Sequence, residues 1–123
     1  MNIEGREEGD IIILRVGGRM DLDEIPRLDA AVQACLEKGA RKIILNLLDI
    51  TDCSSTGISR LVNLHKYLEQ RKGRMVIAEA APVVEYVLEL ARLDDIFDQY
   101  RTEAAAIESF SDDPPDEEIP GVQ

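Results

Sequence analysis

Three consecutive hydroxyl side chains, Ser54, Ser55 and Thr56, followed by Gly57, are the residues of this sequence best placed to do chemistry. An apolar run at 43–47 precedes them and a helical apolar pattern follows, which predicts a strand, a turn and a helix. Serine and threonine are common N-caps because their oxygens accept unpaired backbone N–H groups. A helix N-terminus is also electropositive and suits phosphate. The pattern leaves two interpretations, a plain cap or a hydroxyl that accepts a phosphoryl group.

A catalytic role for these hydroxyls is disfavoured. A nucleophilic hydroxyl needs a general base within hydrogen-bond reach. The only histidine, His65, lies on the same predicted helix, roughly 14 Å along the axis from Ser55 or Thr56. The two cysteines, Cys35 and Cys53, show neither zinc-site nor disulfide spacing. We therefore expect no enzyme activity, no metal and no cofactor.

The charge of the chain restricts its partners and its location. A formal net charge of −11 disfavours nucleic acid and anionic membrane surfaces as partners. No apolar run is long enough to cross a bilayer, and the first residues do not resemble a secretory signal, so we expect a cytoplasmic protein without membrane insertion. Residues 111–123 are acidic and Pro-rich and are predicted to form a disordered tail after a single domain at 1–110.

The segments around the hydroxyls alternate between strand and helix patterns. After an initial hairpin, apolar β-branched runs are followed by stretches with an apolar stripe at helical spacing. The expected strands are 2–6, 11–17, 43–47, 74–78 and an edge strand at 99–101; helices are expected from an Asp23 cap to Lys38, from the hydroxyls to Arg71, from Pro82 to Ala91 and at 103–110. This order predicts an α/β fold with a mixed four- to five-stranded sheet and helices packed on it.

Four segments, in order, resemble the STAS domain, the family of bacterial anti-sigma factor antagonists. Ser54-Ser55-Thr56-Gly57-Ile58-Ser59 falls on the signature of the family, and Gly18-Arg19-Met20-Asp21 resembles the turn before its first helix. Residues 73–78 resemble its fourth strand and residues 93–97 a segment near its end. The resemblance implies a STAS-like domain that binds an anti-sigma factor acting as a serine kinase, with a phosphatase as a further partner.

The resemblance also implies where the site lies. Regulated members are phosphorylated in the segment 53–60, here called the hydroxyl turn, and the corresponding residues are Ser55 and Thr56. Asp21 is carried over as an acid near that turn. The predicted partner-binding residues are Asp21, Asp52, Ser54, Gly57, Ser59, Arg60 and Asn63; the last two fall off the apolar stripe of the helix, as Lys66 does.

The sequence departs from the signature of the family at three positions. Ser54 replaces the usual acid before the acceptor hydroxyls, Ser59 replaces a second glycine, and Asn46 replaces an acid at the end of the apolar strand. An alternative function is a STAS adaptor that is not phosphorylated, as a subunit of a signalling scaffold or a lipid-transport complex. The serine at position 54 favours this alternative.

Overall fold

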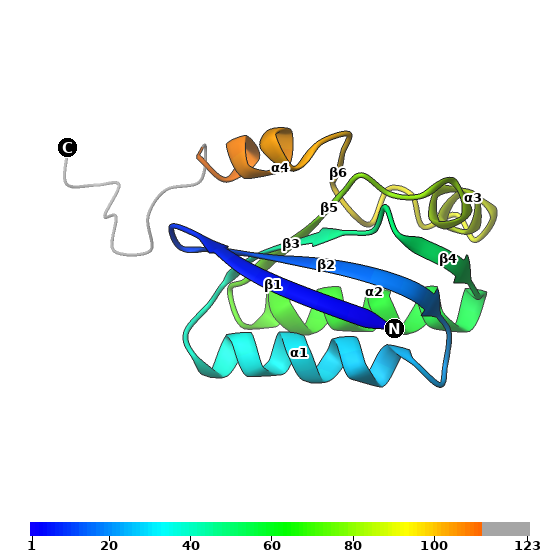
Figure 1. Cartoon of the computed structure of the whole chain (residues 1–123), viewed down its shortest axis with the longest axis horizontal. Coiled ribbons are helices and arrows are strands. Elements are labelled where there is room, and N and C mark those ends of the chain that lie inside the picture. The colour runs from blue at the N-terminus through cyan, green and yellow to red at the C-terminus, as the bar shows by residue number, and fades with distance from the viewer. Residues whose placement is uncertain (112–123) are drawn as a thin grey trace.

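The computed structural model describes residues 1–111, which form one sheet with helices on both of its faces (Figure 1). Apart from Ser111, the predicted acidic tail lies outside the described residues. The strands are β1 (Asn2–Glu8), β2 (Ile11–Met20), β3 (Lys42–Asn46), β4 (Ile50–Cys53), β5 (Arg74–Ala78) and β6 (Gln99–Tyr100). The helices are α1 (Ile25–Glu37), α2 (Ser55–Gln70), α3 (Pro82–Leu90) and α4 (Glu103–Phe110). The predicted α/β fold is confirmed.

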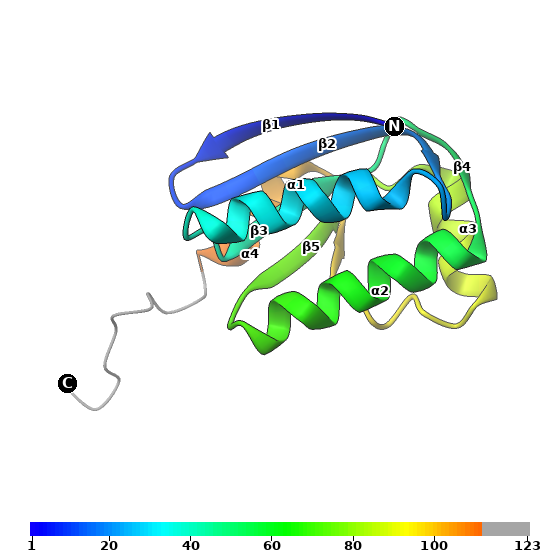
Figure 2. The ribbon, with the colours of Figure 1, turned by 90° about the horizontal axis from the view of Figure 1, so that it is seen from below.

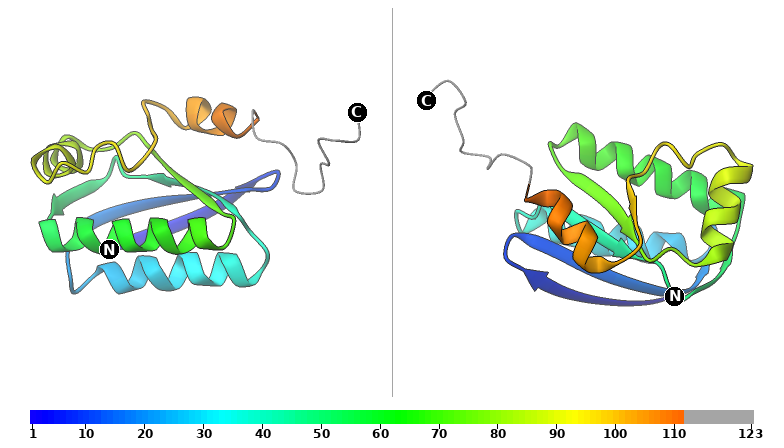
Figure 3. Two further views of the ribbon diagram at one scale, coloured as in Figure 1. Left: turned by 180° about the vertical axis from the view of Figure 1, so that it is seen from behind. Right: turned by 90° about the horizontal axis from the view of Figure 1, so that it is seen from above.

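The sheet is mixed, in the order β1-β2-β3-β5-β6, with β4 pairing with β2. Only the β1–β2 hairpin is antiparallel, and the other pairs are parallel. Helices α1 and α2 lie side by side on one face of the sheet, as the view from below shows (Figure 2). Helix α4 covers the opposite face, and α3 lies near β4 at the end of the sheet where α2 begins (Figure 3).

Strand β3 explains why the central strands are apolar without interruption. Ile43 and Leu45 belong to the main core beneath α1 and α2, whereas Ile44 belongs to a second cluster beneath α4. A strand covered on both faces needs apolar side chains in both directions. Phe110 of α4 closes the second cluster and is buried. In residues 1–111, no helix combines the length and the apolar composition needed to cross a bilayer.

Strand β4 was not predicted; no strand was expected between the one at 43–47 and the helix that starts at the hydroxyls. The second strand, β2, was predicted to end at Gly17. In the structure it continues to Met20, and its pairing with β4 shifts register between Gly18 and Arg19. The extended end of β2 gives residues 50–53 a backbone to pair with, so that Met20 lies opposite Cys53. The sheet therefore has six strands in the described part of the chain. Because β4 ends at Cys53, its pairing with β2 positions the hydroxyl turn at the end of the sheet.

Candidate functional site at the start of α2

The three hydroxyls differ in what they bind. Ser54 is the N-cap of α2 and has extended backbone angles, and its Oγ accepts a hydrogen bond of 3.0 Å from the backbone N–H of Gly57. Ser55 and Thr56 occupy the first two helical positions and are exposed. Neither of their side chains has a hydrogen-bond partner within residues 1–111. The hydroxyl of Ser54 therefore stabilises the start of the helix, and those of Ser55 and Thr56 are accessible to solvent at its positive end.

Gly57 lets the start of α2 sit directly against the end of β2. A Cβ built on Gly57 would lie 2.2 Å from the carbonyl oxygen of Met20 and 3.1 Å from the Cα of Asp21. The same carbonyl oxygen accepts a hydrogen bond of 3.1 Å from the backbone N–H of Ser54. No side chain fits between these two backbones. The turn that carries Asp21 is therefore fixed against the hydroxyl turn.

Asp21 lies beside the hydroxyl turn and also organises the start of α1. Its Oδ1 accepts hydrogen bonds from the backbone N–H groups of Asp23 and Glu24, at 3.1 and 3.0 Å. Its Oδ2 lies 3.2 Å from Nε of Arg19. The expectation that Asp23 caps α1 is wrong, because Glu24 is the N-cap and makes no side-chain cap hydrogen bond. The carboxylate of Asp21 instead binds the two backbone N–H groups that come just before Ile25, the first residue of α1.

The other predicted residues spread over two neighbouring surfaces. Asp52 is exposed at the end of β4, where its Oδ1 accepts a 3.0 Å hydrogen bond from the N–H of Cys53. Ser59, Arg60 and Asn63 are exposed on α2. Helical geometry places Thr56 on the same face as Arg60, whereas Ser55 and Ser59 lie on the adjacent face. The two candidate phosphate acceptors thus look toward different parts of the surface.

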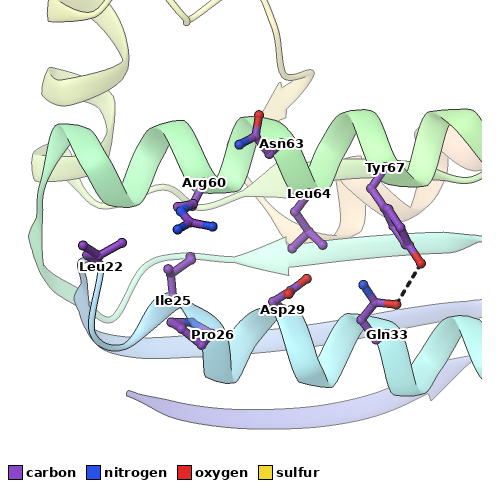
Figure 4. Close-up of a pocket in the computed structure, with 9 residues that line it drawn as sticks. All are labelled: Leu22, Ile25, Pro26, Asp29, Gln33, Arg60, Asn63, Leu64 and Tyr67. Atoms are coloured by element: carbon purple, nitrogen blue, oxygen red, sulfur yellow. Dashed lines mark hydrogen bonds between the residues drawn. The ribbon is translucent and has the colours of Figure 1, made fainter.

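A pocket of about 270 Å³ separates α1 from α2 (Figure 4). Arg60 lies at the end of the pocket nearest the start of α2, together with Leu22. At the other end, the hydroxyl of Tyr67 donates a 3.0 Å hydrogen bond to Oε1 of Gln33. The lining residues are Leu22, Ile25, Pro26, Asp29, Gln33, Arg60, Asn63, Leu64 and Tyr67.

The sequence reasoning identified two of these lining residues, Arg60 and Asn63, and missed the side contributed by α1. The available signal was Leu22, a large apolar residue that precedes the stripe of the first helix. Its side chain is 50% exposed in the structure. Asn63 lies on the outer rim, with its amide directed away from α1, so Arg60 is the α2 cation that reaches toward the pocket.

Within residues 1–111, no histidine or carboxylate is hydrogen-bonded to the hydroxyl of Ser55 or Thr56. The histidine, His65, is buried on the same helix: it is 7% exposed, and its ring lies 4.9 Å from that of Phe97. Burial raises the pKa of the Cys53 thiol to about 11, and the nearby carboxylate of Asp52 adds to the shift, so this thiol is not a nucleophile at neutral pH. Across residues 1–111, no three His, Cys, Asp or Glu side chains gather as metal ligands would. The exposed hydroxyls can receive a group from another protein.

Comparison with known proteins gives consistent results. The model of the STAS domain family matches residues 2–106. An anti-sigma-B factor antagonist from Staphylococcus aureus is 26% identical over 96 residues, which are 78% of this chain and 89% of the relative. A Thermotoga maritima crystal structure described as an anti-sigma factor antagonist superposes with a TM-score of 0.79 at 27% identity, over 87% of this chain and 92% of that one.

The fold also matches SpoIIAA, an anti-sigma factor antagonist solved in two states. The unphosphorylated form gives a TM-score of 0.74 at 20% identity, over 89% of this chain and 96% of that one. The phosphorylated form, described as a Bacillus cell fate determinant, gives 0.66 at 21% identity, over 88% and 98% of the two chains. At these identities the likeness concerns the fold.

Proposed function

This chain belongs to the STAS domain family and is of the anti-sigma factor antagonist type, and from this premise we propose that it binds an anti-sigma factor through the hydroxyl turn and the exposed face of α2. Anti-sigma factor antagonists act as regulators and not as enzymes. We further propose that phosphorylation of Ser55 or Thr56 by a partner serine kinase releases the anti-sigma factor, and that a phosphatase restores binding.

The main support for the proposal is that one of the three hydroxyls caps the helix whereas the other two are exposed and make no hydrogen bond in residues 1–111. Ser54 caps α2, so a phosphate on Ser55 or Thr56 would leave the cap in place. A phosphate adds about −1.5 to −2 charge, and the start of a helix tolerates an anion. The carboxylates of Asp21 and Asp52 already make this surface acidic. Modification would therefore change the charge of the docking surface while the fold stays as it is.

The chemical step belongs to the partner kinase. The Oγ of the acceptor forms a bond to the γ-phosphorus of ATP, the bond from that phosphorus to the bridging oxygen breaks, and ADP leaves. The hydroxyl proton passes to a base of the kinase. The existence of SpoIIAA in phosphorylated and unphosphorylated forms supports the view that a chain of this fold can carry a phosphate.

The decisive test uses a purified anti-sigma factor kinase from the same organism as this chain. A chain with Ser55→Asp and Thr56→Asp should not bind the kinase in a pulldown, and the double alanine variant should bind as the wild type does. Gln70→Asp adds an acid at the exposed far end of the same helix and is the control for unspecific charge effects. If both double variants behave like the wild type, the switch is disproved.

A second measurement identifies the acceptor. Incubation with the kinase and ATP should raise the mass of the chain by one phosphate, and either Ser55→Ala or Thr56→Ala should abolish the increase. Binding without any increase in mass would instead support the adaptor that is not phosphorylated.

A further inference from the structure

We infer that the pocket between α1 and α2 receives an apolar side chain of the anti-sigma factor, and that a carboxylate next to this side chain pairs with Arg60. The inference rests on the proposed function and adds the chemistry by which the partner is recognised. It also assigns Arg60 a second role, as the group for which a phosphate on Thr56 competes.

The size and walls of the pocket suit a single large side chain. A volume of about 270 Å³ lies just below the range of about 300–1,000 Å³ that is usual for sites of drug-sized ligands. Protein interfaces are commonly anchored by one aromatic or aliphatic residue in such a pocket. Ile25 and Leu64 are buried and form an apolar wall, and Leu22 stands half exposed at the rim. An apolar partner side chain would cover the exposed part of Leu22.

The charged side chains that line the pocket indicate which partner group would lie beside the apolar side chain. Arg60 has no ion-pair partner within residues 1–111, although the whole chain carries −11. Asp29 also lines the pocket but forms no ion pair with Arg60. A partner carboxylate would be repelled by Asp29 and attracted by Arg60. It would therefore bind at the end of the pocket nearest the hydroxyl turn.

The same guanidinium lies within reach of a phosphate on Thr56. Residues four apart on a helix have Cβ atoms about 5–6 Å from each other, and long side chains lean toward the helix N-terminus. Arginine binds phosphate through paired, charge-assisted hydrogen bonds. A phosphate on Thr56 would take Arg60 away from the partner carboxylate. Ser55 lies about 100° further round the helix and would act on the partner without this exchange.

The test measures the affinity of the same purified kinase for matched variants by calorimetry. Arg60→Gln should weaken binding about tenfold to a hundredfold, as expected for the loss of a charge-assisted hydrogen bond. Lys38→Gln removes one positive charge at the far end of α1, outside the pocket and outside α2, and should stay within about twofold of the wild type. Leu22→Ala should weaken binding, whereas Leu90→Ala, which trims an even more exposed leucine on α3, should not.

The competition for Arg60 is tested by a double-mutant cycle. Thr56→Asp should cost much less affinity in the Arg60→Gln background than in the wild type, because the contact that it disrupts is already absent. Additive losses would overturn the exchange.

Three results separate the possible failures. Wild-type affinity for both Arg60→Gln and Leu22→Ala would overturn the pocket inference and leave the proposed function standing. A wild-type chain that does not bind the kinase would overturn both. Self-association of the wild type that Leu22→Ala abolishes would assign the pocket to a second copy of this chain and would also overturn the inference.

Discussion

Gly57 and Ser54 together determine how the hydroxyls of Ser55 and Thr56 are exposed at the start of α2. Ser54 satisfies a backbone N–H with its side chain, and Gly57 has no side chain where one would collide with Met20. Each residue solves a local problem at the start of α2. As a result, Ser55 and Thr56 carry no structural duty and face solvent.

The close approach at Gly57 predicts a stability cost for any side chain. We expect Gly57→Ala to lower the free energy of unfolding by about 1–3 kcal/mol or more, because backbone atoms of β2 must move to admit the methyl group. Urea denaturation measures the effect. Gly5→Ala is the matched control, since the nearest atom to its added methyl group is a side-chain atom, the Cδ2 of Leu14 at 3.2 Å, and not a backbone atom. Equal stability of the two variants would mean that the Met20 backbone can accommodate a methyl group at position 57.

Among the elements, α4 is held by a polar network as well as by its apolar face. The Nδ2 of Asn46 donates to one oxygen of Glu103 at 2.6 Å, and the Nη2 of Arg6 donates to the other at 2.7 Å. The N–H of Glu103 donates to the carboxylate of Glu79 at 3.2 Å. Asn46 replaces an acid of the family signature, and here it is a buried donor that ties β3 to α4.

This network predicts that the docking of α4 is sensitive to acid. The hydrogen bond from Arg6, followed by that from Asn46, lowers the pKa of the Glu103 carboxyl. The stabilisation is complete above the ordinary glutamate pKa of about 4.3 and is lost as the pH falls through the lowered value in the folded state. The unfolding free energy of Glu103→Gln should therefore fall less steeply than that of the wild type below about pH 4.3. Parallel pH profiles would contradict the assignment.

The sequence predicted the regular elements better than the connections between them. Apolar runs such as 43–47 and helical stripes such as that of α2 carry their own signal, because burial imposes their period. Strand β4 has only two buried residues, Ile50 and Cys53, and its pairing depends on where β2 ends. No local pattern reports such a dependence.

The candidate site was predictable to the same extent. The hydroxyls, and the placement of Arg60 off the apolar stripe, could be read from spacing along one helix. The contact between Gly57 and Met20, and the pocket that Leu22 forms with residues of α2, join segments distant in sequence. They follow from the packing of α1 and α2 on one sheet.

At the scale of the whole molecule, charge is the property that modification would change most. One phosphate would take the formal net charge from −11 to about −13. Because the acceptor hydroxyls are exposed and unbonded, we expect the secondary structure and the sheet to be retained after modification. The difference between the two states would then reside in the electric field at one end of the domain.

That electrostatic origin predicts a dependence on salt. The loss of affinity for the anti-sigma factor kinase caused by Ser55→Asp with Thr56→Asp should shrink between about 50 and 500 mM NaCl, since exposed charges are screened over about 10 Å at 0.1 M salt. Binding measurements on the wild type and the double variant across that range provide the check. A loss that does not vary with salt would indicate a steric effect of the substitutions.

The close backbone contact between Gly57 and Met20 also has a consequence for how the sequence of such a protein can evolve. Because this contact and the Ser54 cap hold the start of α2, Ser55 and Thr56 can be replaced by other residues with little loss of stability. Selection could then retune which enzyme modifies the chain, or abolish modification altogether, without first having to repair a damaged core. A lineage could pass between regulated and constitutive forms through single substitutions that leave the stability of the fold nearly unchanged.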